Sequence, residues 1–292
     1  EAPASEALAP VVHKMITRSP PGHIRDVLAN CRHLAGSSSL PAELTARSCT
    51  EANEAALLVL PLGTEDGRHG VLCDFARLGS RGQREVPYLE PRSDMLFIVD
   101  QENQECISLK PKPQGHDIKA EMMKVNIESG TPFQQALQKA VDGYVAEHFP
   151  AGDGVACGSV YLNPGKEPGG NIELRVYISS QRARARGYWT GAWTSQWRIV
   201  FTPGQRSSAQ LAGIVEFKTH YAEDGNVHFR RKATKVGKVA ETSDCEAFAS
   251  ELVAEVARFE EDFHAHTEDI CETYGAGALK AMRRVLHISK ER

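Results

Sequence analysis

The sequence lacks an apolar run long enough to cross a bilayer. Its longest candidates, such as Ala55–Leu62, fall far short of the roughly 18 residues that a spanning helix needs. It also lacks closely spaced cysteine pairs, because its seven cysteines are scattered along 292 residues. An odd, scattered set argues against a disulfide scaffold or a zinc knuckle. We therefore expect a reduced, cytoplasmic protein with no membrane span.

Motifs of the common enzyme classes are also missing. No Gly-x-Ser-x-Gly elbow, phosphate-binding loop or calcium-binding loop has the required spacing. The best metal candidate is His264-x-His266 with Glu268 and Cys271, but on a helix its two imidazoles point about 200° apart. We therefore expect no metal, no cofactor and no catalytic residues.

Charge is not in large excess, since the formal net charge is −4, so the chain as a whole is no polyanion binder. Its distribution, however, is uneven. Residues 280–292 carry five Lys or Arg and one Glu, whereas the other 279 residues carry 29 basic and 37 acidic side chains. A tail of +4 on a body of −8 predicts an acidic partner that meets the chain at one end.

The N-terminal half has the pattern of short helices followed by a small β-rich region. Apolar residues at helical spacing predict two short helices between residues 6 and 34, and Gly36–Ser39 forms a flexible joint. From residue 57 to residue 99, short apolar runs between glycines are typical of β-strands. Thr131-Pro132 then has the N-cap and first-position residues of a helix that Pro150 ends.

Residues 155–232 predict an antiparallel meander of four or five strands, because polar and apolar side chains alternate between turn signals. A capping box at Ser243 and Glu246 then opens a long helix that we expect to end at Gly275. A last short helix follows at Ala276–Leu286. The apolar stripe of the long helix would cover the sheet. Because this stripe exceeds what one small sheet needs, we expect an obligate dimer.

Arg182, Arg184 and Arg186 lie on one face of an extended segment. We interpret them as a solvated hairpin tip. The alternative is a nucleic-acid contact that uses base stacking on the nearby tryptophans of residues 189–197. Because those tryptophans recur on one strand face, burial in the core fits them better than stacking. We therefore expect no nucleic-acid partner.

Three segments carry motifs of one known family. They are the Trp-rich strand Trp189–Trp197, the hairpin His220–Val227 and the basic helix Leu279–Leu286. They resemble W-N-G-x-W-x-S-x-W, V-H-Y-Y-E-D-G-N-V and F-K-A-L-R-R-x-L-P of the F-actin capping protein alpha subunit family. Weaker similarities lie in the same order, and the chain is identified as a divergent member over about residues 15–290.

The resemblance implies an α+β fold. An N-terminal helical stalk would occupy residues 1–50, a small β globule 51–130, and a helix with an antiparallel meander sheet 131–242. A long packing helix at 243–275 would cover the sheet, and a basic helix and tail would follow at 276–292. In this family the sheet continues into that of a partner subunit.

The function implied by the resemblance is binding without catalysis: capping of the barbed end of actin filaments, which blocks subunit gain and loss. The partners would be the filament and either a capping protein beta subunit or a second copy of this chain, in the cytoplasm and cytoskeleton. By motif position, the actin-binding residues would be Lys280, Arg283, Arg284 and Lys290. The alternatives are a structural capping subunit within a larger actin-related complex and, from a different class, the nucleic-acid-binding module.

The sequence departs from the family motifs at Ala222, Met282 and His287. Members of the family continue into an amphipathic C-terminal arm that binds actin, whereas this sequence stops at Arg292. The presence of such an arm, and the choice between a free capping protein and a subunit of a larger complex, therefore stay open.

Overall fold

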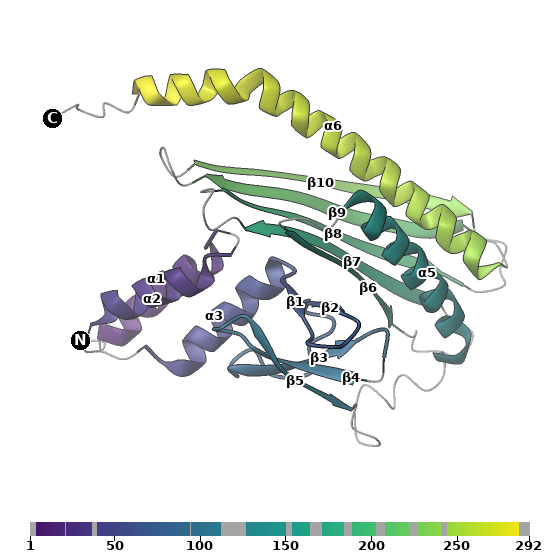
Figure 1. Ribbon diagram of the computed structural model, residues 1–292, viewed down its shortest axis with the longest axis horizontal. Coiled ribbons are helices and arrows are strands. Elements are labelled where there is room, and N and C mark those ends of the chain that lie inside the picture. The colour runs from purple at the N-terminus through teal and green to yellow at the C-terminus, as the bar shows by residue number, and fades with distance from the viewer. Residues whose placement is uncertain are drawn as a thin grey trace.

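A central five-stranded sheet separates two long helices on one face from the N-terminal helices and two small sheets on the other (Figure 1). This computed structural model describes residues 4–20, 22–36, 40–93, 95–111, 127–149, 154–163, 171–183, 189–202, 208–221, 227–240 and 244–285. The arrangement confirms the predicted α+β fold with an antiparallel meander and a C-terminal helix.

Three helices form the N-terminal part: α1 (Ala4–Thr17), α2 (Ile24–Ala35) and α3 (Ala42–Ala55). The helical spacing predicts only the first two. The buried face of α3 consists largely of small or polar side chains, such as Thr45, Ser48 and Asn53. Because the periodicity argument depends on large apolar side chains, this face gives no amphipathic signal.

Two small antiparallel sheets follow. One pairs β1 (Val59–Pro61) with β2 (His69–Val71), and the other contains β3 (Glu85–Glu90), β4 (Met95–Asp100) and β5 (Glu105–Pro111). They confirm the β-rich region and extend it to Pro111. Their hydrophobic cluster also contains Cys157, Tyr161 and Tyr177 from the large sheet. The small sheets therefore pack against the face of the large sheet that α5 and α6 leave uncovered.

The large sheet contains five strands: β6 (Gly154–Asn163), β7 (Ile172–Ala183), β8 (Trp189–Phe201), β9 (Ser208–Tyr221) and β10 (Val227–Ala240). Each pairs antiparallel with the next, which confirms the meander. β10 runs beyond residue 232 because its backbone pairing with β9 continues to Ala240. Ala233 and Gly237 carry no large apolar side chain, so the alternation that marks a strand fades there.

Two helices cover one face of this sheet, α5 (Ile127–His148) and α6 (Cys245–Val285). Pro132 lies inside α5, so the prediction that Thr131 is the N-cap is wrong. Proline has no amide hydrogen to donate to the carbonyl oxygen of residue 128, and the helix nevertheless continues through it to His148. None of the helices in the described ranges combines the length and apolarity needed to cross a membrane.

α6 is one continuous helix of 41 residues, so the predictions that Gly275 ends it and that a separate short helix follows are wrong. A glycine inside a helix costs about 1 kcal/mol relative to alanine, which is too little to stop a helix by itself. At the other end Asp244 Oδ1 accepts hydrogen bonds from the amides of Glu246 and Ala247, at 2.9 and 3.4 Å. The predicted cap, Ser243, lies outside the described residues.

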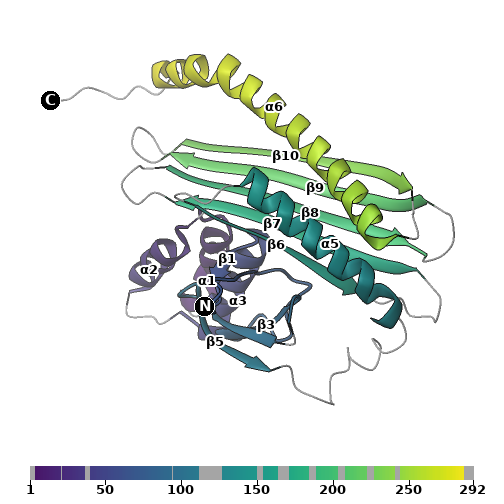
Figure 2. The same ribbon diagram turned by 45° about the vertical axis from the view of Figure 1, so that its right-hand side comes forward.

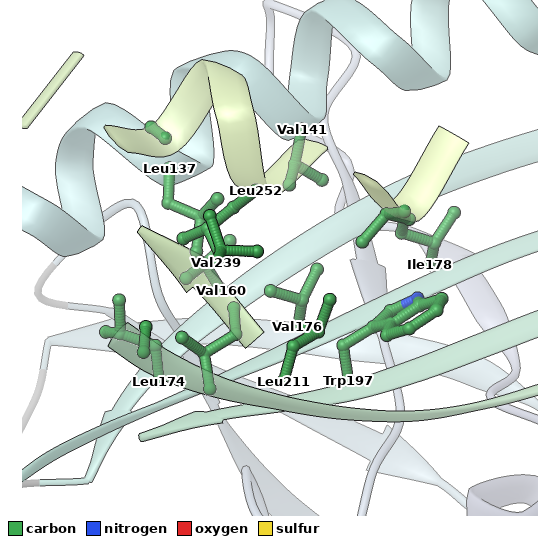
Figure 3. Close-up of a cluster of buried hydrophobic side chains, with 14 of the residues drawn as sticks. Leu137, Val141, Val160, Leu174, Val176, Ile178, Trp197, Leu211, Val239 and Leu252 are labelled. Carbon is green, nitrogen blue, oxygen red and sulfur yellow. The ribbon is translucent and has the colours of Figure 1, made fainter. Parts of the chain in front are cut away.

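The largest hydrophobic cluster fills the space between the large sheet and its two covering helices (Figure 3). Every element of this layer contributes to it: Leu137 and Val141 from α5, Val160, Leu174, Trp197, Leu211 and Val239 from β6 to β10, and Leu252 from α6. The alternation along β7 predicted from the sequence places Ile172, Leu174 and Val176 in this core. The core therefore holds α5 and α6 against the sheet.

Gly213 on β9 allows the Trp197 ring to lie directly against the sheet. A side-chain carbon at position 213 would be 2.0 Å from Cε3 of Trp197, a separation that real atoms do not adopt. The two residues face each other across neighbouring strands. The position therefore requires a residue without a side chain.

We expect Gly213→Ala to lower the free energy of unfolding by about 1–3 kcal/mol, because the ring or the backbone must move. The matched control is Gly191→Ala on β8, where the nearest atom to the added carbon is the Lys218 carbonyl oxygen at 3.8 Å. Urea denaturation at fixed protein concentration compares the two variants. Equal stability of both would contradict the close packing of Trp197.

Candidate functional site

The end of α6 contains most of the basic residues that the sequence singles out. Lys280, Arg283 and Arg284 lie in the last turns of the helix, where its path but not its side chains is described. Lys290 lies outside the described residues. The first half of α6 lies along the sheet, whereas its C-terminal end diverges from the strands (Figures 1 and 2). Three of the four predicted residues thus share one helix end that lies away from the sheet.

One buried carboxylate links α6 to the elements beneath it. Glu260 is only 3% exposed, and its oxygens accept three hydrogen bonds. The Tyr144 hydroxyl and the Trp193 ring nitrogen donate to Oε2, at 2.9 and 3.1 Å. The Ser195 hydroxyl donates to Oε1 at 2.5 Å, and Trp197 Nε1 donates to Ser195 Oγ at 2.5 Å. We call these five residues the Glu260 cluster.

The strand period explains why β8 supplies three members of this cluster. Successive side chains of a strand point to opposite faces, so Trp193, Ser195 and Trp197 all face α6. Tyr144 comes from α5 and Glu260 from α6. Trp193 and Ser195 of the W-x-S-x-W pattern therefore donate, with Tyr144, to one acceptor, and Trp197 donates to Ser195. These bonds join the sheet to both helices.

Burial makes the stabilising effect of the cluster depend on every one of its members. Burial raises the pKa of Glu260, although the hydrogen bonds from Ser195, Tyr144 and Trp193 act in the opposite direction. Burial, and next the charge of Glu260, raise the pKa of Tyr144. A buried donor that loses its acceptor costs about 1–3 kcal/mol. The cluster is consequently stabilising only while its members are all present.

Two cations of β10 hold α6 on either side of Glu260. Arg231 Nη1 donates to the Phe263 carbonyl oxygen at 3.1 Å and to Thr267 Oγ1 at 2.7 Å, with the guanidinium 4.8 Å from the centre of the Phe263 ring. Lys235 forms an ion pair with Glu255 at 2.8 Å. These contacts, together with the Glu260 cluster, set the position and rotation of α6. They thereby set the direction in which its basic end points.

β10 is an edge strand of the described sheet, because it pairs with β9 alone. Its 14 residues contain five Lys or Arg and no acidic residue. Lys232 and Lys238 are exposed on the face away from α6, near Val236, which is 84% exposed. A long strand with an open edge is a template for a further strand. We call the side of β10 away from β9 the open edge.

The structure does not bring together the two histidines of the candidate metal site. His264 Nδ1 lies 3.6 Å from Glu268 Oε2, whereas His266 Nδ1 lies 2.7 Å from the Asp262 carbonyl oxygen. The two rings therefore have different partners, and the Cys271 side chain lies outside the described set. Within the described residues, no group of three or more His, Cys, Asp or Glu could hold a metal ion.

The arginine segment and the tryptophans separate in the structure. Arg182 is exposed at the end of β7, and Arg184 and Arg186 lie outside the described residues. Trp197 is 2% exposed and Trp193 is partly buried, so the prediction of core burial is confirmed for these two. The Trp189 side chain lies outside the described set. The six cysteines with described side chains are free thiols.

The comparisons with known proteins decide the family. A family model described as F-actin capping protein alpha subunit matches residues 12–292. The chain belongs to this family. Among curated proteins, the F-actin-capping protein subunit alpha of Caenorhabditis elegans is 23% identical over 285 residues, which cover 96% of this chain and 90% of that protein. The Arabidopsis thaliana subunit is 28% identical over 209 residues, which cover 70% and 63%.

A solved structure supports the same fold. The homodimeric actin capping protein alpha subunit from Plasmodium berghei superposes with a TM-score of 0.74, at 18% sequence identity, over 98% of this chain and 99% of that chain. The family is one of actin-binding, cytoskeletal subunits that cap the barbed ends of filaments, which confirms the function predicted from the motifs.

Sequence reasoning missed Glu260 and Tyr144. The motifs of the capping protein alpha subunit identify the donors on β8 but not their acceptor. A usable signal exists nonetheless, since Glu260 interrupts the apolar stripe of α6, four residues after Val256 and three before Phe263. A charged residue on the buried face of a helix needs a partner, and the only polar side chains on the facing strand face belong to the motif.

We expect Glu260→Ala to lower the free energy of unfolding by about 3 kcal/mol or more, because two buried donors and one partly buried donor lose their acceptor. Urea denaturation at fixed protein concentration measures the change. Glu260→Gln should lose less, because its amide oxygen still accepts hydrogen bonds.

The matched control for this pair is Glu251→Ala, an exposed position on the same helix, which should change stability by less than about 0.5 kcal/mol. A Glu260→Ala variant as stable as this control would show that the cluster does not hold α6.

Proposed function

We propose that this chain caps the barbed end by binding alone, as one subunit of a dimer, through the basic end of α6. The contacts would come from Lys280, Arg283, Arg284 and Lys290, as their motif positions imply. The observation that carries the proposal is the continuity of α6, which links the buried Glu260 cluster to this basic end without a break. We also propose that the functional parts of the chain divide near residues 50, 130 and 242, and that the basic residues beyond 275 act as a functional part within the continuous helix α6.

The distance along α6 gives the proposal its geometry. Lys280 follows Glu260 by 20 positions, or about 30 Å of helix at 1.5 Å per residue. The contacts of Glu260, Arg231 and Lys235 therefore hold the first half of α6 against the sheet. The other half of α6 carries the basic residues. The body of the chain has a net charge of −8, so the end of α6 is the part best suited to an acidic surface.

Replacing Lys280, Arg284 and Lys290 with alanine should weaken capping by about ten-fold to a few hundred-fold. Each exposed ion pair contributes roughly 0.2–1 kcal/mol, and more when it is desolvated in an interface. The measurement is the rate of pyrene-actin depolymerisation from barbed ends, with the native partner subunit present. Added salt should reduce the association rate of the wild type more than that of the variant.

The control removes the same charge from the opposite side of the sheet: Arg18 just after α1, Arg47 on α3 and Lys110 on β5 are exposed and are replaced together. It should cap like the wild type. If the α6 variant caps normally but melts several degrees lower, its cations stabilise the helix end and do not contact actin.

We propose that the second subunit joins at the open edge of β10, and that it is a capping protein beta subunit. The five basic residues of β10 support this choice. Self-pairing of two β10 strands would set one row of cations beside another, and like charges across a strand pair are destabilising. A partner whose own edge strand is acidic would instead gain from the same row.

Replacing Lys232 and Lys238 with glutamate therefore has opposite effects on the two modes of pairing. The variant should bind a beta subunit more weakly and should self-associate more readily than the wild type, by about ten-fold each. Light scattering of the chain alone and with added beta subunit measures both. Weaker self-association in the variant would point to a homodimer instead.

We propose that the chain works in the cytoplasm, in keeping with the cytoskeletal role of its family. We further propose that it has no nucleic-acid partner, because Trp197 lies in the core and Trp193 packs against it, which disfavours base stacking on either ring. A capping subunit fixed within a larger actin-related complex would co-purify with that complex and show no capping activity of its own, whereas the present proposal predicts capping by the isolated dimer.

A further inference from the structure

Three histidine rings from three elements meet at one end of the large sheet. His23 immediately precedes α2, His220 lies near the end of β9, and His228 lies near the start of β10. The His220 and His228 rings stack with their centres 4.3 Å apart, and the His23 ring meets His220 edge-on at 5.6 Å. We call these residues the histidine cluster. In Figure 1 the start of α2 lies beside the end of the sheet where β9 stops and β10 begins.

The cluster joins the N-terminal helices to the sheet through contacts between aromatic rings. His220 is 5% exposed and sits opposite His228 on β10 and Thr190 on β8. His23 covers it from the side of α2. Stacked and edge-on rings attract each other while they are neutral. A proton on His228 would add a positive charge near Lys218 and Arg230 on the same face of the sheet, and like charges a few ångströms apart repel by about 1 kcal/mol even in water and by more when partly buried.

The surrounding charges disfavour a proton on His228. Lys218 and Arg230 lie on the same face of the sheet, two residues from His220 and His228 respectively. Both form ion pairs with Glu216. Two cations thus share one carboxylate beside the stacked pair. On the α2 side the Asp26 carboxylate lies 3.2 Å from His23 Nδ1 and offsets a charge on that ring alone. The positive end of α2 acts against such a charge.

We propose that the histidine cluster is a pH-sensitive latch between α2 and the end of the sheet. It is closed while the His228 ring is neutral and opens when that ring takes up a proton beside His220, Lys218 and Arg230. Opening separates the start of α2 from the ends of β9 and β10 and gives His220 access to water. The latch does not depend on the capping activity proposed above.

The direction of the pH effect follows from His228. Burial, and next the neighbouring His220, lower the pKa of His228 below its ordinary value of 6.5. The closed state therefore binds fewer protons than the open state. Its stability contribution is fully present above about pH 6.5 and is lost as the pH falls from there through the lower pKa of the closed form. Glu216 stays ionised in this range, because Lys218 and Arg230 outweigh its burial and lower its pKa.

Hydrogen–deuterium exchange of the protein in complex with its partner subunit tests the latch, at about pH 7.5 and about pH 5.5. After correction for the intrinsic pH dependence of amide exchange, the amides of α2 and of the facing ends of β9 and β10 should exchange about ten-fold faster at the lower pH. Ten-fold is the largest change in the opening equilibrium that the uptake of one proton can cause over one pH unit. The amides of β4, which is remote from the cluster in sequence and packing, serve as the internal reference.

Two variants separate the latch from a general effect of acid. His23→Gln with His228→Gln should exchange alike at both pH values, whereas His228→Lys carries a permanent charge and should show the low-pH pattern already at the higher pH. The Lys variant at the higher pH also provides the test if the dimer dissociates in acid. An unchanged acid response in the double Gln variant, or wild-type protection of α2 in the Lys variant, would overturn the proposal.

Discussion

The arrangement of this molecule depends on how one buried carboxylate is satisfied. Glu260 has no cation within its cluster, so its desolvation must be offset by three hydrogen-bond donors that come from both α5 and β8. Such a site has a single geometry. If α6 rotated or shifted by one residue, the carboxylate would face the apolar core and the donors would remain buried without an acceptor. The hydrophobic cluster holds the helices and the sheet together, and Glu260 determines the single position and rotation that α6 adopts on the sheet.

This constraint bears on function because α6 serves two roles. Its first half is part of the core, and its last turns carry the basic residues proposed to meet actin. A protein that caps filaments presents a binding surface in a fixed place, so its function depends on how firmly that surface is held. The β10 strand has a related double role. Arg231 and Lys235 hold α6 from one face, while the open edge of the same strand is where we propose that the second subunit pairs. Dimer formation and the position of α6 are therefore linked through β10.

The parts of this fold that follow simple periodicity were predictable from the sequence. Alternation along β7 and β8 gave the meander, and the apolar stripe from Phe248 to Phe263 gave the helix that covers it. The α3 helix was not predictable, because its buried face is small and polar. Gly275 was given too much weight as a helix stop. Trp193 and Ser195, two of the donors to Glu260, are part of the motif, but their acceptor lies 65 residues beyond Ser195, and only the folded chain brings them together. The actin-binding residues rest on motif position, since their side chains lie outside the described set.

A double-mutant cycle between Glu260 and Tyr144 tests the central claim most directly. Tyr144→Phe removes only the hydroxyl that donates to Glu260 Oε2 and keeps the packing of the ring. Free energies of unfolding for Glu260→Ala, Tyr144→Phe and the double variant give their coupling. The account predicts a coupling of about 1 kcal/mol or more, because the hydroxyl contributes nothing once its acceptor is gone. Effects that add to within about 0.3–0.5 kcal/mol would show that the two residues do not interact, and that another contact places α6 on the sheet.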